Sequence, residues 1–194
     1  MALYVGGTAV TGTQTLDATT LTGNLPAING ASLTDLSAGK LIQITNTADD
    51  SGMEYNQSST MTATSTSGTI TPTSSSNKIF VQVGFQMNVA TGISNTSAGA
   101  RFEIWRDING GGYSVIWNMG YNYNKFRCAT STGGNANEKA LGNINYVAFL
   151  DNPQATTAVT YKVYWNARQD FSNCTCYTNN ATQNDVTLME VDTS

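Results

Sequence analysis

The side chains of this sequence that could carry out chemistry are its carboxylates, because the chain contains no histidine. The absence of histidine excludes Ser-His and Cys-His nucleophile pairs and most catalytic zinc sites. Glycoside hydrolysis needs only two carboxylates and therefore stays open. Their surroundings, such as TADDSG and RDINGGG, are typical of turns, so we interpret these acids as solvated turn residues and expect no enzyme. The candidate acids are Asp49, Asp50, Glu54, Glu103, Asp107, Glu138, Asp151 and Asp170.

Two glycine-rich segments are candidate ligand sites. DINGGG at 107–112 offers oxygen ligands for calcium but lacks the remaining carboxylates of a calcium loop, so a hairpin turn is the better interpretation. STGGNAN at 131–137 has neither a following helix nor a lysine with which to hold a phosphate. We therefore expect no metal and no cofactor.

Cysteine and asparagine give weak signals. An odd number of cysteines (Cys128, Cys174 and Cys176) excludes a complete set of internal disulfides, and reduced thiols are the simpler interpretation. A bridge between Cys174 and Cys176, two apart on one face of a strand, is the less favoured alternative. In so Asn-rich, Ser-rich and Thr-rich a chain, we attribute the glycosylation sequons to chance. These sequons begin at Asn56, Asn95, Asn173 and Asn180.

The aromatic residues could form a surface on which sugars stack, but core and subunit packing is the favoured interpretation. Tyr121 and Tyr123, in GYNYNKFR, are the best candidates for exposed contact with a receptor or glycan, because polar residues flank both. The full set is Tyr113, Trp117, Tyr121, Tyr123, Phe126, Tyr146, Tyr161, Tyr164 and Trp165.

Strands must position these residues. KIFVQVGFQMNVA at 78–90 and AVTYKVYWNAR at 158–168 alternate apolar and other residues, as a strand with one buried face requires. With no helical segment between the strands, the pattern predicts an all-β, antiparallel jelly-roll sandwich, and an Ig-like sandwich is the lesser alternative. Weaker strands are expected at 40–46, 100–107, 113–120, 141–150 and 186–191.

Several predicted strands carry large residues on both faces. Phe80 follows Ile79 and precedes Val81, Tyr164 precedes Trp165, and Met189 follows Leu188. In a monomer, one face of such a sheet would be exposed to solvent, where large apolar side chains are unfavourable. They favour subunits that pack side by side.

The first 39 residues differ from the rest and are expected to form an extended arm, separate from a head at residues 40–194. The phrases TAVTG, TTLTG and ASLTD repeat weakly, and the glycines and Pro26 exclude a helix. Strict alternation is missing, so no sheet face could bury the arm's apolar residues within one chain. Burial against other chains is the remaining option. These residues are Val10, Leu16, Leu21, Leu25, Ile28, Leu33 and Leu36.

Charge and hydropathy exclude two kinds of partner. The net charge is -4 and the nine basic residues are scattered, so nucleic acid is a poor partner. No segment approaches the roughly 20 apolar residues that would span a bilayer. The amino-terminal MALYVGGTAV has no basic region or long apolar run, and we expect synthesis in a cytoplasm.

Four further segments are informative together: ATTLTGNLPAINGASLTDL, KLIQITN, TITPTSSSNKIFVQV and VTLMEV. With these segments, the chain resembles short trimeric fibre or spike proteins of tailed bacteriophages, particularly marine ones. The resemblance implies a homotrimer with an intertwined stalk and a head similar to the C1q/TNF jelly roll. Only MALYVGGTAVTGTQT precedes the stalk residues, so the virion anchor, assigned to Leu3, Tyr4 and Val5, is small.

This resemblance implies a non-enzymatic protein of the virion surface, made in the bacterial host cytoplasm and docked by its arm onto another virion protein. Capsid decoration and a place on the tail are both open. Binding of a host cell-surface glycan through Tyr121 and Tyr123 is the alternative function. A glycan depolymerase and a secreted C1q-like recognition module are more remote.

Overall fold

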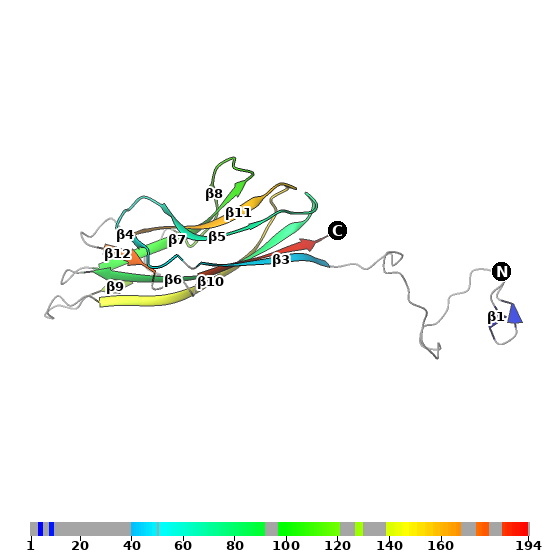
Figure 1. The fold of residues 1–194 in the computed structure, drawn as a ribbon. Coiled ribbons are helices and arrows are strands. Elements are labelled where there is room, and N and C mark those ends of the chain that lie inside the picture. The colour runs from blue at the N-terminus through cyan, green and yellow to red at the C-terminus, as the bar shows by residue number, and fades with distance from the viewer. Residues whose placement is uncertain are drawn as a thin grey trace. The chain divides into compact units, whose positions relative to one another are not determined.

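The computed structural model (Figure 1) contains strands and connecting turns, with no helix among the residues it describes. It describes residues 4–5, 8–9, 40–49, 51–91, 97–120, 127–129, 139–167, 174–178 and 184–193. None of these residues therefore lies in a helix that could span a membrane. The chain divides into two units, residues 1–36 and 37–194. In the first unit, β1 (Tyr4–Val5) pairs antiparallel with β2 (Thr8–Ala9).

The head contains two antiparallel sheets. In the first, β6 pairs with β10 along one edge and with β13 and then β12 along the other. β3 pairs with β13, and β4 pairs with β12. The bounds are β3 (Lys40–Asp49), β4 (Tyr55–Asn56), β6 (Lys78–Thr91), β10 (Lys139–Asp151), β12 (Cys174–Tyr177) and β13 (Asn184–Asp192).

The second sheet has the order β5-β11-β7-β8, and β9 pairs with the start of β7. The chain passes repeatedly between the two sheets, and its first and last main strands, β3 and β13, are neighbours in the first sheet. The main strands are β3, β13, β6 and β10 in the first sheet and β5, β11, β7 and β8 in the second. This is a jelly-roll order. The bounds are β5 (Thr62–Ile70), β7 (Ser97–Ile108), β8 (Ser114–Asn118), β9 (Arg127–Ala129) and β11 (Val159–Ala167).

The core lies between the two sheets. Phe85 of β6 is its centre, with the rings of Phe102 and Trp165 at centroid distances of 5.5 and 5.9 Å. The alternation predicted for β6 and β11 is confirmed, because every residue assigned to their inner faces is buried. These residues are Ile79, Val81, Val83, Phe85, Met87, Val89, Val159, Tyr161, Val163 and Trp165. The predicted all-β antiparallel sandwich is thus confirmed.

The outer face of the first sheet carries an apolar row across four strands. The register places Leu150 of β10 beside Phe80 of β6, Phe80 beside Met189 of β13, and Met189 beside Ile44 of β3. At the two ends of this row, Ile44 is 56% exposed and Leu150 is 51% exposed, while Phe80 and Met189 are half-buried. Large residues therefore stand on both faces of this sheet, as predicted.

The head has two ends, which we name by residues in the first sheet. At the Lys40 end, the first residue of β3 pairs with Asp192, close to the end of the last strand. At the Tyr55 end, β4 pairs with β12 through Tyr55 and Tyr177. Figure 1 shows β4 and β12 at the end of the sandwich opposite to the start of β3.

The sequence pattern gives no signal for β5, β4 and β9. β5 reads TATSTSGTI, and of its inward residues Thr64, Thr66, Gly68 and Ile70 only the last is large and apolar. Thr64 Oγ1 donates to the carbonyl oxygen of Val163 at 3.0 Å, so the buried hydroxyl is satisfied by the neighbouring strand. A strand held in this way has no hydrophobic alternation for sequence analysis to find.

Candidate functional site

Glu190, on the inner face of β13, is the most deeply buried of the described acids and is 0% exposed. Its Oε1 accepts hydrogen bonds from Asn77 Nδ2 at 2.6 Å and from the amide and hydroxyl of Thr73, both at 2.7 Å. Its Oε2 accepts one from Gln43 Nε2 at 2.5 Å. Burial raises the pKa, but hydrogen bonds from Asn77, Gln43 and Thr73 outweigh it and lower the pKa to about 2. Glu190 is therefore a structural anion.

Asp49, at the end of β3, is held in a similar way. Its carboxylate accepts hydrogen bonds from the Ser51, Ser65 and Thr66 hydroxyls at 2.6, 2.7 and 2.6 Å. Burial raises the pKa of Asp49, and the hydrogen bonds lower it below its ordinary value. Because Ser65 and Thr66 belong to β5, this carboxylate joins the two sheets.

Asp151 takes part in a third network. Both of its carboxylate oxygens lie 2.8 Å from Arg106 Nη1, and the Tyr161 hydroxyl donates to Oδ2 at 2.7 Å. Burial and the adjacent Asp151 raise the pKa of Tyr161, so its proton stays on the hydroxyl. This arrangement joins β10, β7 and β11.

The remaining candidate acids of the second sheet also serve structure. Glu103 accepts a hydrogen bond of 2.8 Å from Trp105 Nε1 and forms an ion pair of 3.3 Å with Arg101. Asp107 Oδ1 accepts from the Gly112 amide at 3.0 Å and closes the turn between β7 and β8. The predicted hairpin at DINGGG is thus confirmed, with Asn109 at a φ of 53°. Asp50, Glu138 and Asp170 lie outside the described residues.

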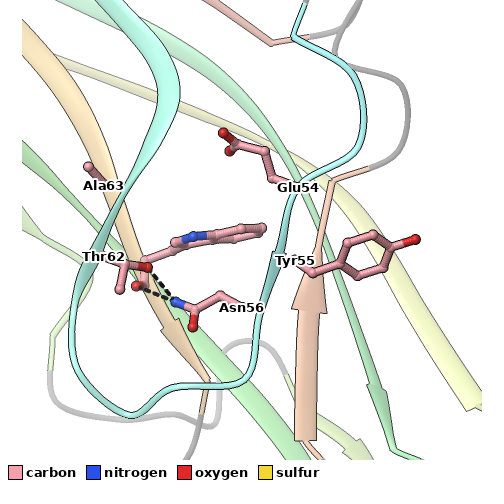
Figure 2. A pocket seen from close by; sticks show the side chains of 6 residues that line it. Glu54, Tyr55, Asn56, Thr62 and Ala63 are labelled. Carbon is pink, nitrogen blue, oxygen red and sulfur yellow. Dashed lines mark hydrogen bonds between the residues drawn. The ribbon is translucent and has the colours of Figure 1, made fainter.

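Glu54 has a different setting, because it lines an open pocket of about 430 Å³ between β4 and β5, at the Tyr55 end. We name it the Glu54 pocket. In Figure 2, the Glu54 and Tyr55 side chains point in different directions, with the Tyr55 ring turned away from Thr62 and Ala63. The pocket is lined by Glu54, Tyr55, Asn56, Thr62, Ala63 and Trp165.

Asn56 fixes the floor of this pocket. It is buried, and its Nδ2 donates to Thr62 Oγ1 at 2.7 Å and to the Trp165 carbonyl oxygen at 3.0 Å, the bonds drawn in Figure 2. Its Oδ1 accepts from the Ser58 amide at 2.7 Å. The Cys176 thiol donates to the Asn56 carbonyl oxygen at 3.3 Å. Side chain and main chain of Asn56 are therefore both fixed.

Glu54 is held through its own backbone and one carboxylate oxygen. Its amide donates to Thr178 Oγ1, and its carbonyl oxygen accepts from the Thr178 amide, both at 3.1 Å. Its Oε1 accepts from the Ser65 amide at 2.8 Å. The wall of the Glu54 pocket is thus tied to β5 and to the residue that follows β12.

Tyr55 presents an exposed aromatic ring beside the Glu54 pocket. The ring is 65% exposed and stacks against Tyr177, with centroids 6.0 Å apart and an interplanar angle of 28°. Sequence analysis identified neither Tyr55 nor Thr62 as a site residue. The available signal was a single tyrosine in a polar turn, DDSGMEYNQSS, next to an asparagine.

The aromatic residues proposed from the sequence divide into groups. Tyr161 and Trp165 belong to the core, and Trp117 packs on Phe102 at 5.5 Å. Tyr164 stacks on Trp105 at 4.3 Å, with Tyr113 beside it at 5.7 Å. Tyr146 is 72% exposed on β10. Tyr121, Tyr123 and Phe126 lie outside the described residues.

Other predicted sites also fall largely outside the described residues. Of the anchor residues, Tyr4 and Val5 form β1, while Leu3 and the apolar arm residues Val10, Leu16, Leu21, Leu25, Ile28, Leu33 and Leu36 lie outside. The division into arm and head stays a prediction. The Cys128 and Cys174 side chains lie outside too, as do Asn95, Asn173 and Asn180. Asn56 is buried at 7% exposure, which disfavours its glycosylation.

No family model matches the sequence, and no curated protein is similar to it. Among solved structures, the chain is similar to one from infectious bursal disease virus, Gt strain, with TM-score 0.39 and 11% identity over 87% of this chain and 42% of that one. The VP2 subviral particle of that virus gives TM-score 0.30 and 11% identity over 87% and 42%. This chain thus spans about two fifths of theirs, and the fold assignment rests on strand order.

Proposed function

We propose that this chain is a non-enzymatic structural protein of a virus particle, a short homotrimeric fibre or spike. In this proposal, residues 1–39 form the stalk and dock onto another virion protein, with Leu3, Tyr4 and Val5 as the anchor. The jelly-roll head faces outward. Capsid and tail are both candidate locations.

The observation that carries this proposal is the apolar row on the outer face of the first sheet. An antiparallel sheet that meets water on one face usually carries polar residues there, and contiguous exposed apolar residues mark contact surfaces. Ile44 and Leu150, at the two ends of the row, are each about half exposed. Packing this face against neighbouring copies would bury the row.

The arm supports the same assembly. Its apolar residues are spaced so that no sheet or helix of one chain could bury them. Lys40, the first residue of β3, lies in the same strand as Ile44. Three heads joined through the apolar row would therefore start their arms close to a common axis, where the arms could wind around one another.

Sedimentation velocity of the full chain at micromolar concentration tests the trimer. We expect the wild type to be a trimer. The double variant Ile44→Asp, Leu150→Asp should dissociate at a protein concentration at least tenfold higher than the wild type does, because six charges would enter the interface. The matched control is Val115→Asp, at a valine of β8 that is 47% exposed on the other sheet. It should stay trimeric. A monomeric wild type would contradict the proposal.

Labelling of intact particles with an antibody to the head tests the location. Label over the capsid makes the protein a decoration or head fibre, and label on the tail makes it a tail spike. Purified particles that carry no label at all would contradict a virion role. The control is the same antibody after absorption with purified head.

A further inference from the structure

We propose that the Glu54 pocket and the exposed Tyr55 ring together bind a neutral oligosaccharide, with one pyranose unit in the pocket and the next unit stacked on Tyr55. This inference concerns the head alone and does not depend on the trimer or on the particle. The proposed site is also different from Tyr121 and Tyr123, the contact residues that the sequence suggests.

The position of the site suits contact with an external ligand. It lies at the Tyr55 end, whereas the arm joins the head at the Lys40 end, where Lys40 pairs with Asp192. The pocket volume of about 430 Å³ falls within the roughly 300 to 1,000 Å³ typical of small-molecule sites.

The site is already formed without a ligand. Glu54 is tied to Thr178 and Ser65, and Asn56 is tied to Thr62, Trp165 and Ser58. A ligand would not have to order this segment, and preorganisation of this kind favours affinity. Tyr55 is likewise kept in place by its stack on Tyr177.

The polar groups match the hydroxyls of a sugar. A carboxylate such as that of Glu54 has several acceptor positions, and Ser65 occupies only part of this capacity. Thr62 Oγ1 accepts from Asn56, so the Thr62 hydroxyl can turn its own hydrogen toward a ligand oxygen. The pocket therefore offers both an acceptor and a donor to the hydroxyl groups of a sugar.

The aromatic group matches the other face of a sugar. A pyranose ring has a face of C–H groups, which packs well on the negative face of an aromatic ring. Tyr55 is 65% exposed and its ring stacks on Tyr177, so the ring offers such a surface. A tyrosine adds contact area at small cost in conformational entropy.

Charge selects against acidic sugars. None of the six described residues that line the pocket is basic, and Glu54 places a negative charge in it. A sialic or uronic acid would be repelled by this carboxylate. Glycoside hydrolysis requires two carboxylates at the sugar, and Glu54 is the one acid among the described lining residues. Binding without cleavage is therefore the function inferred.

The test is binding of the purified full chain to a printed array that carries neutral hexose oligosaccharides together with their sialylated and uronic acid forms. We expect retention on neutral oligosaccharides and none on the acidic forms. For the best neutral probe, Tyr55→Ala and Glu54→Gln should each weaken the affinity measured by calorimetry at least tenfold. Gln at position 54 keeps an oxygen for the Ser65 amide, so folding should be preserved.

The matched control is Tyr146→Ala, which removes another highly exposed tyrosine, on β10. This variant should bind as the wild type does. Failure of the wild type to bind any neutral oligosaccharide would overturn the proposal, as would equal losses in Tyr55→Ala and Tyr146→Ala. Sedimentation of Tyr55→Ala serves as a second check, because a change in oligomeric state would make Tyr55 a subunit contact instead.

Discussion

Asn77 donates a hydrogen bond of 2.6 Å to Oε1 of Glu190, and so joins the crossover from β5 to β6 to the last strand of the head. Thr73 of the same crossover donates twice more to this oxygen. A single buried carboxylate thereby fixes the path of the chain from one sheet to the other. The stability of the head should depend on it.

Replacement of Glu190 by Gln should lower the free energy of unfolding at pH 7 by about 3 kcal/mol. The variant keeps the size of the side chain but loses the charge that makes the four hydrogen bonds strong, and it turns an NH2 group toward donors. Urea denaturation followed by circular dichroism measures this. Glu54→Gln is the control and should cost below about 1 kcal/mol. Equal losses in the two variants would contradict a special role for Glu190.

The same carboxylate predicts how stability depends on pH. Its pKa is about 2 in the folded head and about 4.5 in the unfolded chain, so the unfolded chain binds more protons between these values. The contribution is complete above about pH 4.5 and is lost as the pH falls toward 2. Because a tenfold change in an acid dissociation constant corresponds to about 1.4 kcal/mol, the loss should be about 3 kcal/mol. The slope of unfolding free energy between pH 4.5 and 2 should be smaller in Glu190→Gln, and an unchanged slope would contradict the assignment.

Gly68→Ala should destabilise the head by about 1 to 3 kcal/mol through overpacking. A Cβ at this position would lie 2.8 Å from Cγ1 and 3.0 Å from Cβ of Val186. A β-branched residue in a strand has little rotamer freedom with which to move aside. Thermal unfolding compares this variant with Thr69→Ala, an exposed neighbour that should cost below about 1 kcal/mol. A Gly68→Ala protein as stable as the wild type would show that the sheets can separate locally.

Tyr161→Phe should cost about 1 kcal/mol, because it removes the hydroxyl that donates to Asp151 and leaves the ring in the core. Asp151 keeps its contact with Arg106, so the carboxylate is not left unpaired. Guanidinium denaturation measures the difference, with Tyr146→Phe as an exposed control that should change stability by less than about 0.5 kcal/mol. A loss above about 3 kcal/mol in Tyr161→Phe would indicate a disturbed core.

The strands that could be predicted are those whose core contacts come from large apolar side chains. β6 and β11 alternate strictly, and each of their predicted inner residues is buried. β5 could not be found in this way because Thr64 and Thr66 bury hydroxyls that are satisfied by Val163 and Asp49. Such bonds depend on partners far away in the sequence, and a local pattern carries no trace of them.

The candidate site was less predictable than the fold. Tyr55 and Tyr177 are separated by 122 positions and are brought together only by the pairing of β4 with β12. Both strands are too short to give a periodic signal, with 2 and 4 residues. The sequence does point to Glu54, but only as one member of a set of eight acids, and the other four acids of this set that the structure describes serve structure.

The position of β13 between β3 and β6 has a consequence for synthesis. Among the described strands, β3 pairs with β13 alone. β3 is the first strand of the head to be synthesised, and it has no partner strand until β13 has been synthesised. Until then the edge of β6 that β13 will occupy is open, and such an edge can template wrong pairings. A chain cut short before Asn184 could not close this sheet. β3 and β6 therefore stay unjoined until residues 184–192 have been synthesised.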